Sequence, residues 1–186
     1  MEVTLRQDNL DMPMQWFAMR ATYHREMLAK QLLEQRRIEC YVPLHSVLKE
    51  NHGRKVRMKE PVVSSLLFAH AMRDDLQLAK SKIPFLQYMT TVEGTRRVPI
   101  VVPDYQMRQF MRATSVYDEQ LTFLRPEQVD LKQGTPVRIH GGVFDGMEGR
   151  FMKIKGKRNK RVVVSIQNVI AVAIAYVDPD YIEVLS

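Results

Sequence analysis

The side chains that most often perform catalysis are present in this sequence, but they are scattered. The histidines lie far apart and lack the spacing of a metal site; they are His24, His45, His52, His70 and His140. The single cysteine, Cys40, lies in an apolar stretch and is expected to be buried. The Asp74-Asp75 pair is better explained as the start of a helix than as an acid–base pair. We therefore predict that the protein is not an enzyme and holds neither a metal nor a cofactor.

The stretch between residues 134 and 164 is rich in glycine and in positively charged residues. Val137 and Ile139 alternate with polar residues, which is the period of a half-buried strand. The glycines supply sharp corners, and they lack the G-K-S/T ending of a phosphate-binding loop. The charged run at residues 153–161 is typical of a hairpin tip. Short strands separated by glycine corners predict a small β-barrel at residues 134–186, which presents a surface and leaves no room for a catalytic cleft.

Length and composition narrow the class of protein. The chain has 186 residues, 45% of them hydrophobic, which is enough for one modest core or two small ones. Its net charge of +7 favours contact with nucleic acid or a nucleoprotein assembly. A single cysteine excludes an internal disulfide and fits a reducing compartment. Because no apolar run has the length of a signal peptide or a membrane span, we expect a cytoplasmic protein without membrane contact.

The rest of the chain alternates between strand-like and helix-like stretches. Residues 1–13 are polar and aperiodic, and we expect them to be disordered or frayed. Residues 14–114 predict elements in the order β-α-β-β-β-α-β-β-α, including a hairpin at 45–60 whose return strand is basic. This order indicates an antiparallel sheet flanked by helices, which is an α+β fold. Residues 115–133 lack a sustained period, so we interpret them as a linker to the predicted barrel.

Sequence motifs in both halves of the chain point to one family. The spacing G-x-x-V-x-I…G-x-F-x-G-x-x-G begins at Gly134 and resembles the KOW motif of NusG-type transcription elongation factors. Five segments of the N-terminal half of the chain resemble the N-terminal domain of the same family: residues 16–17, 25–26, 38–43, 61–69 and 102–104. Two departures are Ser64-Ser65, where the family has Pro-Gly, and Leu66, where it has tyrosine. The apolar run at 162–177 looks most like the UpxY group of specialised NusG paralogues of Bacteroidetes.

The resemblance implies an NGN domain at residues 14–114 and an SH3-like KOW barrel at 134–186. It also implies a monomeric transcription elongation regulator, a processive antiterminator that acts on a polysaccharide biosynthesis operon. The NGN domain would bind the clamp helices of RNA polymerase. The KOW domain would recruit a second partner, either ribosomal protein S10 or Rho. The residues that would line the polymerase-binding depression are Phe17, Leu66, Phe68 and Tyr88; for each of them, burial in the core is the alternative.

Two further sets of residues are candidates for binding. The cations that would face the non-template DNA strand are Arg20, Arg25, Arg73 and Lys82, and ordinary solvated side chains are the alternative. The residues that would contact a partner of the KOW domain are Phe144, Lys155, Lys157 and Arg158. For this set, the alternatives are a Phe144 packed onto the barrel and a solvated hairpin tip. A ribosome-binding or RNA-binding KOW protein without polymerase contact would account for the same basic tip, and it is the rival function.

Overall fold

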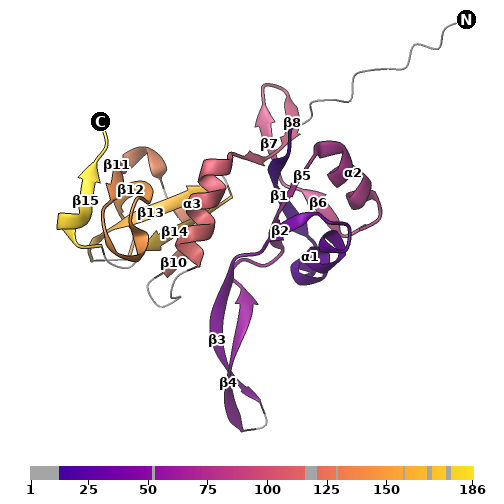
Figure 1. Cartoon of the computed structure of the whole chain (residues 1–186), viewed down its shortest axis with the longest axis horizontal. Coiled ribbons are helices and arrows are strands. Elements are labelled where there is room, and N and C mark those ends of the chain that lie inside the picture. The colour runs from indigo at the N-terminus through magenta and orange to yellow at the C-terminus, as the bar shows by residue number, and fades with distance from the viewer. Residues whose placement is uncertain are drawn as a thin grey trace, which may run out of the picture. The chain divides into compact units, whose positions relative to one another are not determined.

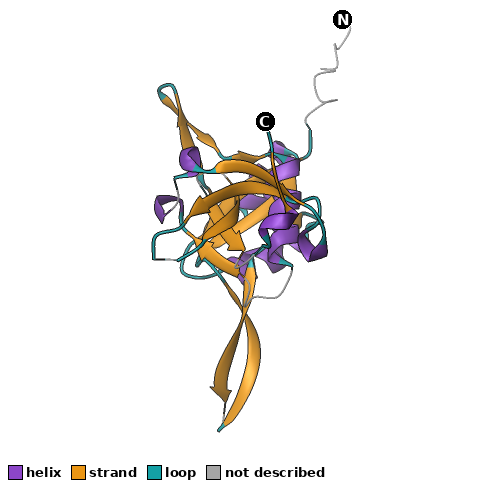
Figure 2. Cartoon of the chain, turned by 90° about the vertical axis from the view of Figure 1, so that its left-hand side faces the viewer, coloured by secondary structure: helices purple, strands orange, loops and turns teal. Residues whose placement is uncertain are grey.

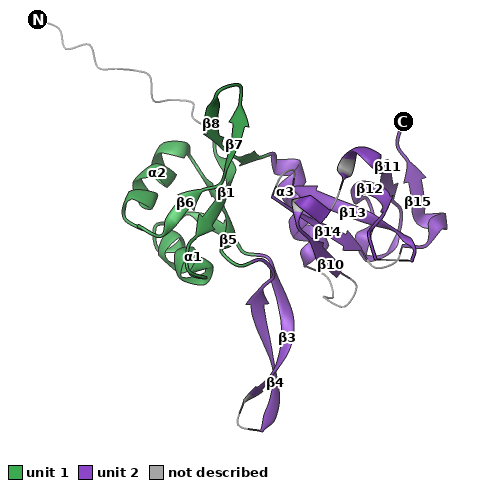
Figure 3. Cartoon of the chain, turned by 180° about the vertical axis from the view of Figure 1, so that it is seen from behind, with its two compact units in different colours: residues 1–42, 64–102 green, residues 43–63, 103–186 purple. Residues whose placement is uncertain are grey.

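A computed structural model describes residues 13–51, 53–115, 121–128, 130–156, 158–166, 169–174 and 177–186. The chain divides into two compact units (Figure 3). Unit 1 comprises the residues up to 42 together with 64–102, and unit 2 comprises 43–63 together with 103–186. The prediction of an α+β fold with mostly antiparallel sheets is confirmed. Among the described residues, every helix is too short or too polar to traverse a bilayer.

Unit 1 is built on an antiparallel sheet with the strand order β2-β5-β1-β6, and β9 also pairs with β1 (Figure 1). Its strands are β1 (Gln15–Ala21), β2 (Glu39–Tyr41), β5 (Leu66–Ala71), β6 (Leu86–Tyr88) and β9 (Val101–Val102). Two helices of nine residues each accompany the sheet, α1 (Glu26–Glu34) and α2 (Arg73–Ser81). A short separate hairpin consists of β7 (Thr90–Glu93) and β8 (Arg96–Pro99).

The two faces of the unit 1 sheet carry different side chains. Successive side chains of a strand alternate between faces, and directly paired residues share one. The first face carries Phe17, Met19, Cys40 and Tyr88, and Lys80 of α2 reaches the Tyr88 ring. The opposite face carries a second set of residues, which comprises Trp16, Ala18, Leu66, Phe68 and His70. The helix α2 therefore packs on the side of the first face.

Unit 2 contains a six-stranded antiparallel sheet with the order β10-β14-β13-β12-β11-β15. Its strands are β10 (Leu121–Leu124), β11 (Thr135–Ile139), β12 (Glu148–Lys153), β13 (Lys160–Ile166), β14 (Ile170–Ile174) and β15 (Ile182–Val184). The helix α3 (Asp104–Thr114) packs against β13 and β14, and its Met107, Phe110 and Ala113 are fully buried. A cluster of buried apolar side chains forms part of the core of this unit and comprises Leu124, Met152, Ile154, Val163, Ala171 and Ala173.

The structure differs from the predicted linker at residues 115–133. Residues 116–120 and 129 lie outside the described residues, but Leu121–Leu124 is a strand, β10, that pairs with β14 along its whole length. Interpreting 121–124 as linker was therefore wrong. The helix α3, which the sequence analysis assigned to the domain at residues 14–114, packs on the six-stranded sheet of unit 2. A strand of four residues is too short to show a period, and helix patterns do not reveal which sheet a helix joins.

A long two-stranded ribbon, β3 (Leu44–Asn51) and β4 (Arg54–Pro61), forms a sheet of its own (Figure 2). All eight residues of each strand are paired, from Leu44 with Pro61 at the base to Asn51 with Arg54 at the tip. The predicted hairpin is thus confirmed, and His52 at its tip lies outside the described residues. None of the ribbon's described side chains is buried.

Candidate functional site

Unit 1 has a recess of about 570 Å³ between the end of β5, the helix α2 and the segment that follows α1. Its lining residues are Met14, Arg36, Arg37, Ile38, His70, Ala71, Met72, Asp75, Leu78, Ala79 and Lys82. Three segments that are distant in sequence meet here, because β5 lies between β1 and β2 in the sheet and α2 follows directly after it. The recess is thus a product of the tertiary fold.

The recess combines exposed apolar side chains with a charged rim. Met14, Met72 and Leu78 are 51%, 39% and 66% exposed, although each is a large hydrophobic residue. Around them lie more cations than anions, because Arg36, Arg37 and Lys82 outnumber Asp75. A concave surface of this kind suits a protein partner whose contact area is apolar at its centre and acidic at its edge.

His70 is held in place on one wall of the recess. Its ring stacks on Trp16, with centroids 4.8 Å apart and planes inclined by 13°. Its Nδ1 lies 3.2 Å from Oε2 of Glu39 on the neighbouring strand β2. The pairing of Trp16 and Glu39 with His70 in the sheet brings the three side chains onto one face. This wall of the recess is therefore preorganised by the sheet.

The structure places the predicted polymerase-binding residues largely inside the protein. Phe17, Leu66 and Phe68 are only 1%, 3% and 0% exposed, so their side chains offer no surface to a partner. Tyr88 is half-buried and contacts Phe17 edge-on, at 5.7 Å between ring centroids. Leu66 and Phe68 lie on one face of the sheet, whereas Phe17 and Tyr88 lie on the other. The four residues therefore do not line one depression, and the alternative of core packing describes the first three.

Three of the four predicted DNA-binding cations are exposed, and the fourth, Arg25, is half-buried. Arg20 is exposed at the end of β1, and Arg73 and Lys82 lie at opposite ends of α2, about 13 Å apart along the helix. Arg25 is half-buried, with its guanidinium 4.3 Å from the centre of the Phe85 ring and 5.1 Å from that of Tyr23. Arg25 thus has a structural role in fixing the turn before α1.

The comparison with protein families agrees with this architecture. A family model described as "Transcription termination factor nusG" matches residues 14–111, which is more than half of the chain. The chain belongs to the NusG family. No curated protein matches the sequence. The matched segment contains every residue that lines the recess, and it ends within α3.

Membership of the NusG family makes the chain a transcription factor of a non-enzymatic family. Within the described residues, no group of three or more His, Cys, Asp or Glu is arranged to hold a metal. Cys40 is buried, and this burial raises the pKa of its thiol to about 12. The thiol is therefore protonated at neutral pH and is a poor nucleophile.

A buried carboxylate links the start of α1 to the turn before β5. Glu26 is 4% exposed, and its Oε2 accepts a hydrogen bond of 3.0 Å from the backbone N–H of Ser65. Ser65 has a φ of +68°, a conformation that favours glycine, and it stands where the family pattern has glycine. Glu26 thus helps to hold this turn in position.

Replacing Glu26 with alanine is expected to lower the free energy of unfolding by about 2 kcal/mol, because the N–H of Ser65 loses its acceptor. Urea unfolding measures the loss. The Glu26→Gln variant retains an oxygen acceptor and is expected to lose less. Glu34→Ala serves as the control, since Glu34 is exposed and forms an ion pair with Lys30 across one helical turn. Equal losses for Glu26→Ala and Glu34→Ala would contradict the assignment.

In unit 2 the predicted partner-binding residues are divided between core and surface. Phe144 is 6% exposed and therefore packs inward, whereas its neighbour Val143 is 58% exposed. Lys155 and Arg158 are exposed on the turn between β12 and β13. Lys157 lies outside the described residues. The alternative of a packed Phe144 is thus the one that the structure adopts, and Val143 is the apolar side chain that this corner presents.

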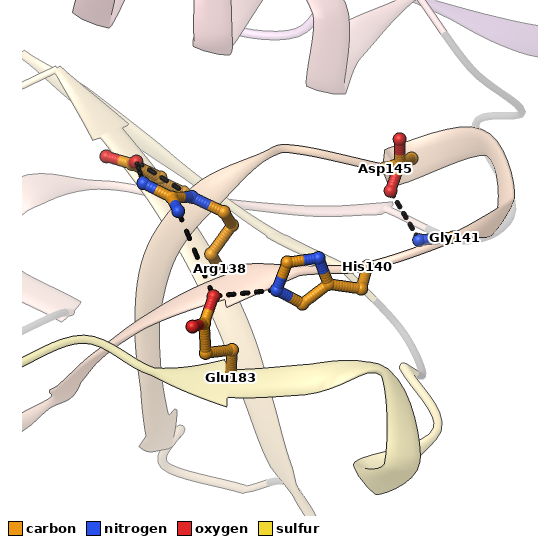
Figure 4. A network of polar contacts seen from close by, with 6 residues as sticks. Arg138, His140, Gly141, Asp145 and Glu183 are labelled. Carbon is orange, nitrogen blue, oxygen red and sulfur yellow. Dashed lines mark hydrogen bonds and ion pairs between the residues drawn. The ribbon is translucent and has the colours of Figure 1, made fainter.

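A polar network joins three strands on the surface of unit 2 (Figure 4). Arg138 donates to Oε1 of Glu148 over 2.7 Å, and its other terminal nitrogen lies 3.8 Å from Glu183. His140 approaches the same Glu183 oxygen to 2.7 Å. Arg138, Glu148 and Glu183 belong to β11, β12 and β15, and His140 directly follows β11, so the network links three paired strands. Its side chains are about half exposed, and pairs of this kind add little stability.

Proposed function

We propose that this NusG-family chain is a transcription elongation regulator that binds RNA polymerase through unit 1. The observation that carries the proposal is the recess, since it joins concavity, exposed apolar side chains and a cationic rim inside the family-matched segment. We assign the contact with the clamp helices to Met14, Met72 and Leu78. Phe17, Leu66, Phe68 and Tyr88 are not among the residues that line the recess.

Binding of this kind regulates elongation without catalysis. A factor shifts an equilibrium between two polymerase states only by the difference in its affinity for them. Tighter binding to the elongating state than to the paused state therefore prolongs transcription. Such a factor acts as a processive antiterminator, and the resemblance to the UpxY group makes a polysaccharide operon its proposed target. Exposed cations such as Arg20 and Lys82 are the proposed contacts with non-template DNA.

The six-stranded sheet of unit 2 is proposed to be an SH3-like KOW barrel that recruits a second partner, either ribosomal protein S10 or Rho. Support comes from the glycine corner at Gly141 and Gly142, whose φ values are +86° and +67°, and from the exposed Val143 beside it. Lys155 and Arg158 add positive charge on the turn at the opposite end of β12. Tethering to a polymerase-bound domain would raise the effective concentration of such a partner.

The test of polymerase binding is a pair of matched charge substitutions. Leu78→Asp places a charge in the recess, and we expect it to weaken binding to RNA polymerase about tenfold or more, which is about 1.4 kcal/mol per factor of ten. Val92→Asp is the control, because Val92 is 64% exposed in the same unit but outside the recess, compared with 66% for Leu78. Affinity measured by biolayer interferometry that is equal for the two variants would refute the assignment.

The rival function, RNA binding without polymerase contact, is favoured by the exposed Lys155 and Arg158. It predicts that the chain binds RNA tightly in a salt-sensitive manner and that Lys155→Ala with Arg158→Ala abolishes this binding. It also predicts that purified polymerase is not retained by the native chain. A native chain that retains polymerase and loses it through Leu78→Asp decides for the elongation regulator.

A further inference from the structure

The β3–β4 ribbon carries a large share of the positive charge of the chain. Between residues 44 and 61 the sequence has five lysines and arginines and two glutamates, a net charge of +3, compared with +7 for the whole chain. No described side chain of the ribbon is buried. Its side chains are therefore accessible to an external partner from both faces.

The register of the ribbon divides this charge unequally between its two faces. Directly paired residues share a face, and next-but-one residues follow them on it. One face carries Ser46, Leu48, Glu50, Lys55, Arg57 and Lys59. The other face carries His45, Val47, Lys49, Arg54, Val56, Met58 and Glu60. The first face has three cations along β4 and one anion, Glu50, which is paired with Lys55 in the ribbon. The second face has two cations, Lys49 and Arg54, and Lys49 forms an ion pair with Glu60.

We propose that this cationic face of the β3–β4 ribbon binds the phosphate backbone of double-helical DNA. Next-but-one residues of a strand are about 6.8 Å apart, so Lys55, Arg57 and Lys59 form a line about 14 Å long. A DNA duplex presents a negative charge about every 1.7 Å along its axis, which such a line complements. The major groove of B-form DNA, about 12 Å wide, also admits a two-stranded ribbon, whereas that of an RNA duplex is too narrow.

Protection against edge-to-edge aggregation is the other use that exposed strands make of lysine. Protective charges have no need to gather on a single face, because strand edges pair from either side. The second exposed hairpin of this chain, β7–β8, has Arg96 and Arg97 adjacent in sequence and hence on opposite faces. Of these two hairpins, β3–β4 alone has a row of three cations on one face of a strand. The proposal is independent of polymerase docking, since unit 1 supplies none of these residues.

The experiment measures binding of the full chain to a labelled B-form DNA duplex by fluorescence anisotropy across a salt series. In the Lys55→Ala/Arg57→Ala variant, the slope of log affinity against log salt is expected to fall in magnitude by about 0.9 per lost contact, about 1.8 in all. An increase of about fourfold in salt then weakens the native chain about tenfold more than the variant. Far-UV circular dichroism verifies folding, and the removed side chains are exposed.

The matched control is Arg96→Ala/Arg97→Ala, which removes the same charge from the other exposed hairpin and is expected to leave the slope unchanged. Arg57→Lys, which retains the charge, is likewise expected to keep the native slope. Equal slopes for the native chain and the Lys55→Ala/Arg57→Ala variant would overturn the proposal, as would equal losses in both double variants. Tighter binding of single-stranded DNA or of an RNA duplex would also overturn it.

Discussion

Replacing Phe110 with alanine is expected to lower the free energy of unfolding by about 3–5 kcal/mol, the largest loss that we expect from a single substitution in this chain. Phe110 is 0% exposed in α3. The helix has 11 residues, and no side chain caps its N-terminus with a hydrogen bond. A helix of this length depends on packing for its stability. Removal of the ring both deletes buried contacts and leaves a cavity that the surroundings fill only in part.

Urea unfolding gives the size of the loss, and hydrogen exchange gives its location. The amides of β13 and β14 are expected to exchange faster in Phe110→Ala, because α3 packs against these strands. Tyr105→Ala is the control on the same helix: Tyr105 is 58% exposed, and its loss is expected to change stability by less than about 0.5 kcal/mol. Similar stabilities for the two variants would show that α3 is not anchored by its buried face.

The sequence predicted the elements whose pattern is local and repeated. The β3–β4 hairpin and α3 were both expected from their periodicity or turn residues, and the structure contains both. The corner at Gly141 and Gly142 was expected to need conformations that other residues avoid, and both have positive φ. Each of these signals lies within a few residues, so a single sequence is enough to show it.

The candidate site was harder to predict, because it depends on contacts between distant segments. The recess joins Met14, Ile38 and Leu78, which no periodicity connects. Leu66 and Phe68 were expected at a surface by resemblance, but they alternate with Leu67 on a central strand, and β5 is buried on both faces. The sequence signal that distinguishes the two cases is the apolar run at residues 66–69 in β5, which is typical of a strand without a solvated face.

Gly149 shows how a correct observation led to an incomplete explanation. The sequence indicated that this glycine, like Gly146, supplies an unusual backbone conformation. Gly146 has a φ of +71°, but Gly149 is not among the residues with positive φ. Instead, a Cβ at Gly149 would lie 2.7 Å from the backbone oxygen of Val163 and 2.9 Å from Cγ1 of Val162. The position needs glycine because β13 approaches it closely, which only the tertiary structure reveals.

Replacing Gly149 with alanine is therefore expected to lower the free energy of unfolding by about 3 kcal/mol, at the upper end of the range for overpacking. A flexible side chain could move aside, but the closest atom belongs to the backbone of β13. That strand is held between β12 and β14 and cannot retreat without breaking pairs on its other side. We expect the amides of β12 and β13 to lose protection from hydrogen exchange together.

Gly94→Ala separates steric contact from backbone strain in this experiment. Gly94 has a φ of +59°, and a Cβ at this position would have no other atom within 4 Å, so its substitution is expected to cost only the strain of the left-handed conformation, about 1 kcal/mol. Protection in β12 and β13 should remain native in that variant, because Gly94 lies in the β7–β8 hairpin. If Gly149→Ala were no less stable than Gly94→Ala, the close approach of β13 would not be what requires glycine. A larger loss of stability in Gly149→Ala, with faster hydrogen exchange only in β12 and β13, would instead establish that these two strands approach closely because residue 149 has no side chain.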